Sequence, residues 1–209
     1  MSREEIIAGA MAIPTMMSEA DFNVLYDKAM KYITEGGCAI EIGAWKGSSA
    51  YVIGSVCKEK NAVLYEIDTY AGDQNKDSER NRPESMNSYD EAVKNPDFFW
   101  VVKNNLKGLP VAILKGDSRE IMNYLPDKMF DLCFIDGNHD KEVVAVDMKN
   151  ALKKVKVGGL VCGHDHGNTW YNADVQGAVE EVLGTDWVCD GVATINGTEY
   201  LTTIWSHIV

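Results

Sequence analysis

Short hydrophobic runs alternate along this chain with longer stretches whose apolar positions recur at helical spacing. The runs show no polar alternation, which is typical of strands buried on both faces of a parallel sheet. They predict strands at Cys38–Ile42, Ala62–Ile67, Val111–Leu114, Leu132–Ile135 and Leu160–Cys162. The stretches between and after them predict helices at Ser48–Lys58, Pro96–Lys107, Ser118–Tyr124 and His139–Lys154. This βαβ series indicates a doubly wound α/β fold.

Two amphipathic helices are expected before the first strand, near Arg3–Met11 and Ser18–Thr34. Ser18 followed three residues later by Asp21 resembles a helix-capping arrangement. Apolar residues at helical spacing give the second helix one inward face, and Gly36-Gly37 follows it as a stop signal.

The C-terminal end departs from the βαβ pattern. After a predicted helix at Val175–Leu183, two β-rich runs, Trp187–Ile195 and Thr198–Ser206, flank Asn196-Gly197. Asn-Gly between such runs is a strong signal for a type I′ hairpin. We therefore expect the sheet to close with an antiparallel C-terminal hairpin.

One polar segment, 72–97, fits neither a strand nor a helix and is rich in acidic and basic residues. A segment this long and polar within a compact domain is usually a functional loop. We treat residues 1–209 as a single domain in which the N-terminal helices (1–35) and a lid at 72–97 close over the substrate.

Composition narrows the classes of partner. The 209 residues include 45% hydrophobic and 25% charged residues, as in ordinary globular proteins, and 32 acidic against 20 basic residues give a net charge of −12. This charge repels phosphate backbones and anionic lipid, so we expect a small-molecule substrate and neither nucleic acid nor a membrane as partner. The oligomeric state stays open, with a homo-oligomer among the alternatives.

The cysteines and the absence of an apolar leader favour the cytoplasm. Five cysteines stand without paired spacing, mostly inside apolar runs, which is typical of reduced buried thiols. The chain has no apolar stretch near the roughly 18 residues of a membrane span, and its N-terminus lacks a basic segment followed by an apolar one.

A glycine-containing turn is the strongest chemical signal. It reads Glu41-Ile-Gly43-Ala-Trp45-Lys-Gly47-Ser-Ser49 and lies where the first buried strand meets a helix. Glycines there allow backbone N–H groups to approach a ligand closely. The spacing is neither that of the dinucleotide fingerprint nor that of a P-loop. The alternative is that the glycines serve only a tight turn.

Acids follow the later strands at the positions where each strand ends, namely Asp68, Asp117, Asp136 and Asp165. The carboxyl ends of parallel strands meet at one edge, where ligands bind, so these acids are expected to converge on one crevice. Asp68 is placed to bind both hydroxyls of a ribose. The alternatives are helix N-caps, for Asp117 and Asp136 above all, and an exposed loop acid for Asp68.

The order of these motifs resembles class I S-adenosylmethionine-dependent methyltransferases, most of all the small-molecule O-methyltransferases of the macrocin and catechol type. The resemblance is carried by the glycine turn and by Ile67-Asp68-Thr-Tyr-Ala-Gly-Asp73, Gly116-Asp117-Ser118, Phe134-Ile-Asp136-Gly-Asn-His139 and Gly158-Gly-Leu-Val-Cys-Gly163-His-Asp165. It implies a mostly parallel, seven-stranded, Rossmann-like sheet with a reversed final hairpin, and S-adenosylmethionine as cofactor.

Roles for individual residues follow from the resemblance alone. It assigns Asp68 to the ribose, and Asp117 and Ser118 to the adenine. The residues implied around the methionine portion of the cofactor are Glu41, Gly43, Trp45, Gly47 and Ser49.

The resemblance also implies a divalent-metal site, at Asp136, His164 and Asp165. Its metal-dependent members usually have an acid where this chain has His164. Magnesium prefers oxygen ligands, whereas imidazole favours manganese, iron, nickel or zinc, so both the metal and its identity stay open.

Methyl transfer to a hydroxyl needs a base, and His139, three residues after Asp136, is our candidate. His164 and His166 compete for this role, and each histidine could instead be a helix cap or a supporting donor. The predicted function is methylation of a hydroxyl on a small metabolite. The alternatives are a non-catalytic, regulatory S-adenosylmethionine-binding domain and a nucleotide-dependent oxidoreductase on the same kind of sheet.

Overall fold

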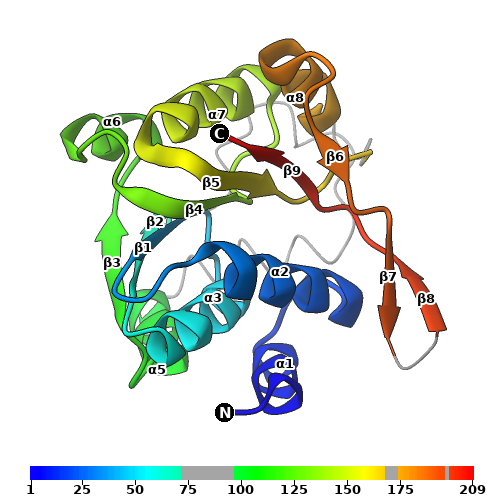
Figure 1. Ribbon diagram of the computed structural model, residues 1–209. Coiled ribbons are helices and arrows are strands. Elements are labelled where there is room, and N and C mark those ends of the chain that lie inside the picture. Colours follow the sequence, from blue (N-terminus) through cyan, green and yellow to red (C-terminus); the bar gives the residue numbers. More distant parts are fainter. Residues whose placement is uncertain (72–96, 168–173, 196–197) are drawn as a thin grey trace.

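The computed structural model describes residues 1–71, 97–167, 174–195 and 198–209. Its main sheet has the order β3-β2-β1-β4-β5-β9-β6 among these residues (Figure 1). The parallel strands are β1 (Cys38–Ile42), β2 (Val63–Asp68), β3 (Val111–Lys115), β4 (Phe130–Ile135) and β5 (Val155–Gly163). β9 (Trp205–Ile208) runs antiparallel to β5, and the two-residue strand β6 (Val188–Cys189) pairs antiparallel with β9. The predicted α/β fold and its seven-stranded sheet are confirmed.

Helices cover both faces of this sheet (Figure 1). One face packs against α1 (Arg3–Ala12), α2 (Glu19–Tyr32), α3 (Ser48–Glu59) and α5 (Phe98–Asn105). The other packs against α6 (Ser118–Ile121), a 3₁₀ turn (Met122–Tyr124), α7 (Lys141–Lys154) and α8 (Val175–Leu183). Alternate residues of each central strand enter the two separate cores, which is why the strands read as unbroken apolar runs.

Side-chain hydrogen bonds determine where two of the predicted helices begin. Ser18 caps α2 through a reciprocal pair of hydrogen bonds with Asp21, as its sequence spacing predicts. α7 begins at Lys141 rather than at His139, because the Asn138 side chain accepts a hydrogen bond from the Asp140 amide (2.7 Å) and holds a turn there. The expected lid at 72–97 lies almost wholly outside the described residues.

The predicted C-terminal hairpin forms, and its base, the antiparallel pair β6 and β9, closes the main sheet. β7 (Val192–Ile195) and β8 (Thr198–Leu201) pair with each other as a separate two-stranded ribbon beside α2 (Figure 1), while Asn196-Gly197 lies outside the described residues. Two backbone hydrogen bonds, from Asp190 N to Ile204 O and from Thr202 N to Gly191 O, connect the β6–β9 pair to the ribbon. Each predicted β run therefore contributes one strand to the main sheet, β6 or β9, and one strand to the ribbon, β7 or β8.

The cysteine side chains follow the pattern expected from the sequence. All five cysteines are free, and Cys57, Cys133 and Cys162 are buried in the cores. In the part of the chain that the structure describes, no helix is long and apolar enough to span a bilayer.

Candidate functional site

The turn after β1 brings two strand ends into contact. Gly43 has a φ of +87°, and a Cβ placed on it would lie 2.3 Å from the backbone oxygen of Asp136, directly after β4. Gly47 and Trp45 also have positive φ values, of 88° and 47°. Position 43 therefore needs glycine both for its conformation and for the close approach of the next strand end.

Asp68, at the end of β2, organises this turn. Its Oδ2 accepts hydrogen bonds from the amides of Ala44 (3.0 Å) and Trp45 (2.9 Å), and its Oδ1 accepts one from Tyr70 N (2.7 Å). Burial raises the pKa of Asp68 even though these amides favour the ionised form. Both oxygens thus serve the backbone, and the ribose role of Asp68 stays a prediction.

Glu41 lies beside a second buried acid that the sequence reasoning missed. Glu41 on β1 is the register partner of Glu66 on β2, and both side chains are fully buried. The Tyr70 hydroxyl donates a hydrogen bond to Glu66 Oε2 (2.5 Å). Neither oxygen of Glu41 makes a hydrogen bond of normal geometry within the described residues. The alternating acids of Glu66-Ile-Asp68 are the sequence signal for a second acid near this turn, but only the strand register shows that Glu66 faces Glu41.

The two residues predicted at the adenine already have protein partners. Asp117 caps α6, accepting a hydrogen bond from the Arg119 amide (2.9 Å), and its hydrogen bonds with the Arg119 side chain lower its pKa. Ser118 donates to Oδ1 of Asp147 on α7 (2.7 Å), whose pKa burial raises to about 6. Asp117 therefore matches the helix-cap alternative, and the adenine roles of both residues stay predictions.

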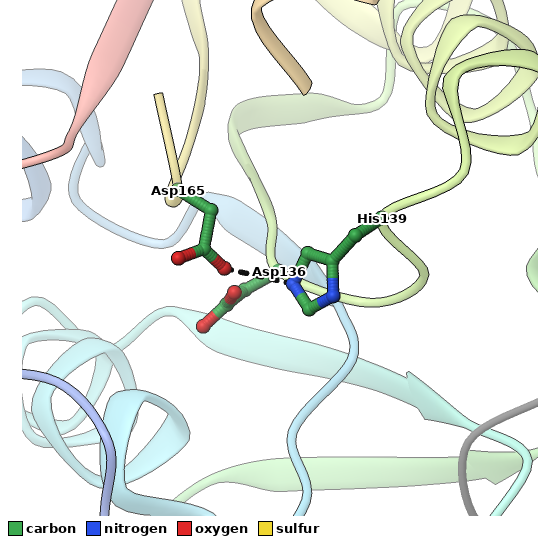
Figure 2. Close-up of side chains that lie close together, drawn as sticks. All are labelled: Asp136, His139 and Asp165. Atoms are coloured by element: carbon green, nitrogen blue, oxygen red, sulfur yellow. Dashed lines mark ion pairs between the residues drawn. The ribbon is translucent and has the colours of Figure 1, made fainter. Parts of the chain in front are cut away.

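A second group lies where β4 and β5 end, formed by Asp136, His139 and Asp165 (Figure 2). His139 Nε2 lies 2.7 Å from Asp165 Oδ2, and one potential ligand atom from each residue lies within 4.8 Å of the others. Asp165 has a φ of +63°, a left-handed conformation that non-glycine residues seldom adopt. Two of the predicted metal ligands, Asp136 and Asp165, belong to this group together with His139, and the role of His164 as a ligand stays a prediction.

His164 lies next to this group, among three carboxylates. Its Nδ1 is 3.4 Å from Asp165 Oδ1 and 3.7 Å from Asp136 Oδ1, and its Nε2 is 3.5 Å from Asp21 Oδ2. Burial alone would lower the pKa of His164, but these carboxylates outweigh it and raise the pKa well above its usual value. Asp21 was predicted only as a capping residue, because the sequence does not show which strand end α2 approaches.

The short contact between His139 and Asp165 shifts the pKa values of both residues. Burial would lower the pKa of His139, yet the hydrogen bond and the charge of Asp165 raise it. Burial would raise the pKa of Asp165, but its contacts with His139 and His164 lower it strongly. The competing candidate His166 lies outside the group, with its ring 4.7 Å from that of Trp187. A hollow at this strand edge is lined by Asp136, Asn138, His139, His164 and Trp205, among others.

Comparison with known proteins places both groups inside one segment that matches a known family. The family described as "Methyltransferase domain" matches residues 40–166, which run from β1 to just beyond Asp165. The structure resembles the O-methyltransferase NovP (17% identity, 93% of this chain and 82% of that chain, TM-score 0.63). It also resembles cofactor-bound Rv0187 from MTB (16%, 98% and 88%, 0.61) and the calicheamicin methyltransferase CalS11 (16%, 87% and 76%, 0.54). At these identities the likenesses establish the fold.

Proposed function

The chain belongs to the methyltransferase-domain family and is an S-adenosylmethionine-dependent enzyme, and from that premise we propose that it methylates a hydroxyl group of a small molecule. The observation that carries the proposal is the His139–Asp165 pair, with 2.7 Å between Nε2 and Oδ2, at the strand edge that also holds the glycine turn. A hydroxyl is a poor nucleophile until it loses its proton, and this pair supplies an oriented imidazole for that step.

The reaction is an in-line displacement. The acceptor oxygen attacks the methyl carbon of the sulfonium, the sulfur–methyl bond breaks, and its electron pair returns to sulfur. The hydroxyl proton passes to the neutral imidazole of His139, and the Asp165 carboxylate stabilises the imidazolium that results. The enzyme's main task is to align the two reactants, since positioning supplies much of the acceleration in such reactions.

We also propose a divalent-metal site at Asp136, His139 and Asp165, favoured by the 4.8 Å grouping of their ligand atoms. Two carboxylates with one imidazole fit manganese, iron, nickel or zinc better than magnesium. Such an ion, when bound, would favour the ionised form of an acceptor hydroxyl. In that state His139 would be a ligand and not the base.

Two observations support the class of acceptor. NovP is described as an O-methyltransferase and CalS11 as a TDP-rhamnose 3′-O-methyltransferase. The net charge of −12 is unfavourable for a polyanionic substrate such as nucleic acid. We therefore infer a small hydroxylated acceptor, and a sugar hydroxyl is the first class to test.

The test is a turnover screen with isotopically labelled S-adenosylmethionine and a panel of sugars, nucleotide sugars and phenols. Mass spectrometry locates the transferred methyl group, and each reaction is repeated with chelator and with added manganese. We expect an oxygen-methylated product that His139→Ala no longer forms. Methyl transfer only to nitrogen or carbon would overturn the acceptor proposal. Turnover unchanged by chelator would overturn the metal proposal and leave His139 as the base.

A further inference from the structure

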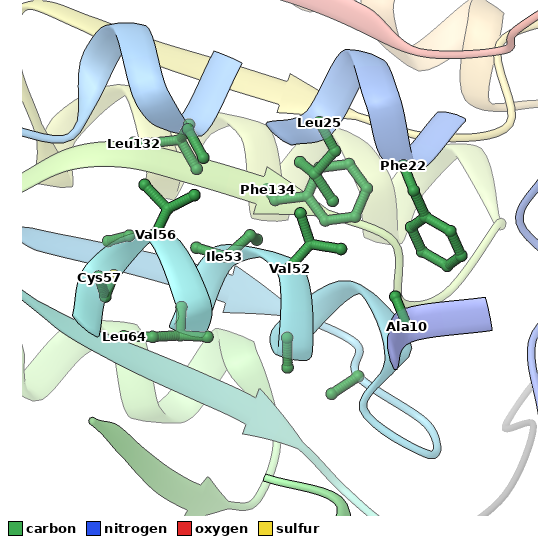
Figure 3. Close-up of a cluster of buried hydrophobic side chains, with 14 of the residues drawn as sticks. Ala10, Phe22, Leu25, Val52, Ile53, Val56, Cys57, Leu64, Leu132 and Phe134 are labelled. Atoms are coloured by element: carbon green, nitrogen blue, oxygen red, sulfur yellow. The ribbon is translucent and has the colours of Figure 1, made fainter. Parts of the chain in front are cut away.

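The acid pair Glu41 and Glu66 lies on a dry face of the sheet. The two residues face each other across β1 and β2, on the side where α3 packs. On this side Val52, Ile53 and Val56 of α3 pack over neighbouring strands in the apolar cluster drawn in Figure 3. Water therefore cannot stabilise two negative charges at this position, and burying even one bare carboxylate is costly.

No cation offsets the pair within the described residues, because the ion pairs found there include neither glutamate. The charged groups facing Glu41 are Glu66 and Asp68 from the β2 side and Asp136 from the end of β4. From α3 it meets only the Ser49 hydroxyl, which favours the ionised form. Besides Glu41, the titratable groups that face Glu66 are Asp68 and Tyr70.

These surroundings keep protons on the pair. Burial raises the pKa of Glu41 well above its usual range, and it raises that of Glu66 to about 8 despite the Tyr70 hydrogen bond. Two interacting carboxyl groups titrate as one unit, so the proton belongs to the pair and not to one residue. Burial and the lack of a facing cation among the described residues therefore favour the protonated form of this pair.

S-adenosylmethionine carries an ammonium and a sulfonium group. The methyl donor therefore supplies the positive charge that the Glu41–Glu66 pair lacks among the described residues. We propose that Glu41 and Glu66 form one proton-exchanging subsite, which releases a proton to solvent when the cationic methyl donor binds at the β1 turn. The proton returns when the ligand leaves. This inference rests on the proposed position of the donor's methionine portion at Glu41–Ser49. Tyr70 is a positioning residue, because its hydroxyl holds Glu66 beside Glu41.

Isothermal titration of the full chain with S-adenosylmethionine tests this directly. Titrations at one pH in phosphate and in Tris, whose ionisation heats differ, give the number of protons released. At pH 7 we expect close to one proton per bound ligand and less above pH 8. Below the pKa of the pair, affinity should rise by up to tenfold per pH unit. An infrared band of protonated carboxyl should weaken on binding.

Variants test whether the proton is shared by the pair. Glu41→Gln should bind more weakly, Glu41→Gln and Glu66→Gln should each release less than the wild type, and Tyr70→Phe should shift the pH dependence. The matched control is Asp131→Asn, a buried acid paired with Lys156 (2.6 Å) outside the β1 turn, which should leave the proton count unchanged. The wild-type buffer comparison does not depend on whether any variant folds.

The possible outcomes distinguish a failure of the proton-exchange inference from a failure of the proposed function. Binding whose heat is the same in both buffers would overturn the proton exchange while leaving the methyl donor assigned. Full proton release by both Glu41→Gln and Glu66→Gln would also overturn it. If the wild type did not bind S-adenosylmethionine at all, the proposed function itself would fail.

Discussion

Two acid-rich groups lie at one edge of the sheet and differ in whether nearby imidazoles compensate their negative charge. At the ends of β4 and β5, Asp136 and Asp165 are matched by the imidazoles of His139 and His164. At β1 and β2, Glu41 and Glu66 are fully buried and have no imidazole partner among the described residues. The pKa of Asp165 consequently falls while those of the two glutamates rise.

This difference suggests that the two groups have different roles at this edge of the sheet. The histidine group combines carboxylates with imidazoles, which is the arrangement that the proposed base and the proposed metal site require. The glutamate group offers carboxyl groups alone among the described residues, which suits a ligand that brings positive charge. The acids of a methyl-donor site therefore need not act alike, even when they follow equivalent strands.

The largest expected effect comes from removing the carboxylate of the histidine group. Asp165→Ala should lower kcat by about 100- to 10,000-fold, the range for a lost acid–base partner, because His139 loses its orientation and its counter-charge. Affinity for S-adenosylmethionine should change little. Steady-state kinetics and titration calorimetry measure the two. A variant that lost cofactor binding in parallel with kcat would remove the distinction between the groups.

The contact that joins the groups should be the most sensitive point for stability. Gly43→Ala combines a φ of +87° with a Cβ only 2.3 Å from the Asp136 oxygen, so it should cost about 3 kcal/mol or more. Gly108→Ala is the matched control, since its φ is +83° but its Cβ meets no atom within 4 Å. That change should cost about 1–2 kcal/mol. Equal losses in urea unfolding would contradict a role for the close approach.

Glu66→Gln should change how stability depends on pH. In the folded protein the pKa of Glu66 is raised to about 8, so between its unfolded pKa and pH 8 the folded state binds more protons. The free energy of unfolding should then fall by about 1.4 kcal/mol per pH unit through this group, and the variant should lose that slope.

Asp131→Asn should change the pH dependence of the free energy of unfolding in the opposite direction. Burial would raise the pKa of Asp131, but its hydrogen bonds with Lys156 and Thr34 lower it, so the wild type loses this contribution as the pH falls. Denaturation of all three proteins across the pH range measures both slopes. Parallel curves for Glu66→Gln and the wild type would show that Glu66 is ionised in the folded protein.

The smallest effect is the pH dependence of turnover. If neutral His139 is the base, the active fraction falls up to tenfold for each pH unit below its raised pKa. At saturating substrate, kcat should rise with pH through and above the ordinary histidine value and then level off. A rate that falls with pH across this range would contradict the assignment of His139 as the base.

Local patterns in the sequence predicted the frame of this site, because strand ends and capping residues are encoded within a few positions. Asp136 and Asp165 were found in this way. Partnerships across strands were not accessible: Glu66 facing Glu41 requires the register of β1 and β2, and Asp21 near His164 requires the docking of α2. His139 was predicted as the base, but its pairing with Asp165 depends on where two distant strands end.

The same limit applies at the C-terminal end. Asn196-Gly197 predicts the hairpin, yet nothing local states which part of the hairpin joins the main sheet. The pairing of β9 with β5 decides that question, and it depends on tertiary contacts.

The separate β7–β8 ribbon also makes the enzyme modular. β6 and β9 pair with each other, and β9 with β5, without using any residue of the ribbon. A short linker from Gly191 to Thr202 could therefore replace the ribbon and leave the main sheet hydrogen-bonded as it is. The position offers an engineer a splice point for a tag or a reporter domain beside the N-terminal helices.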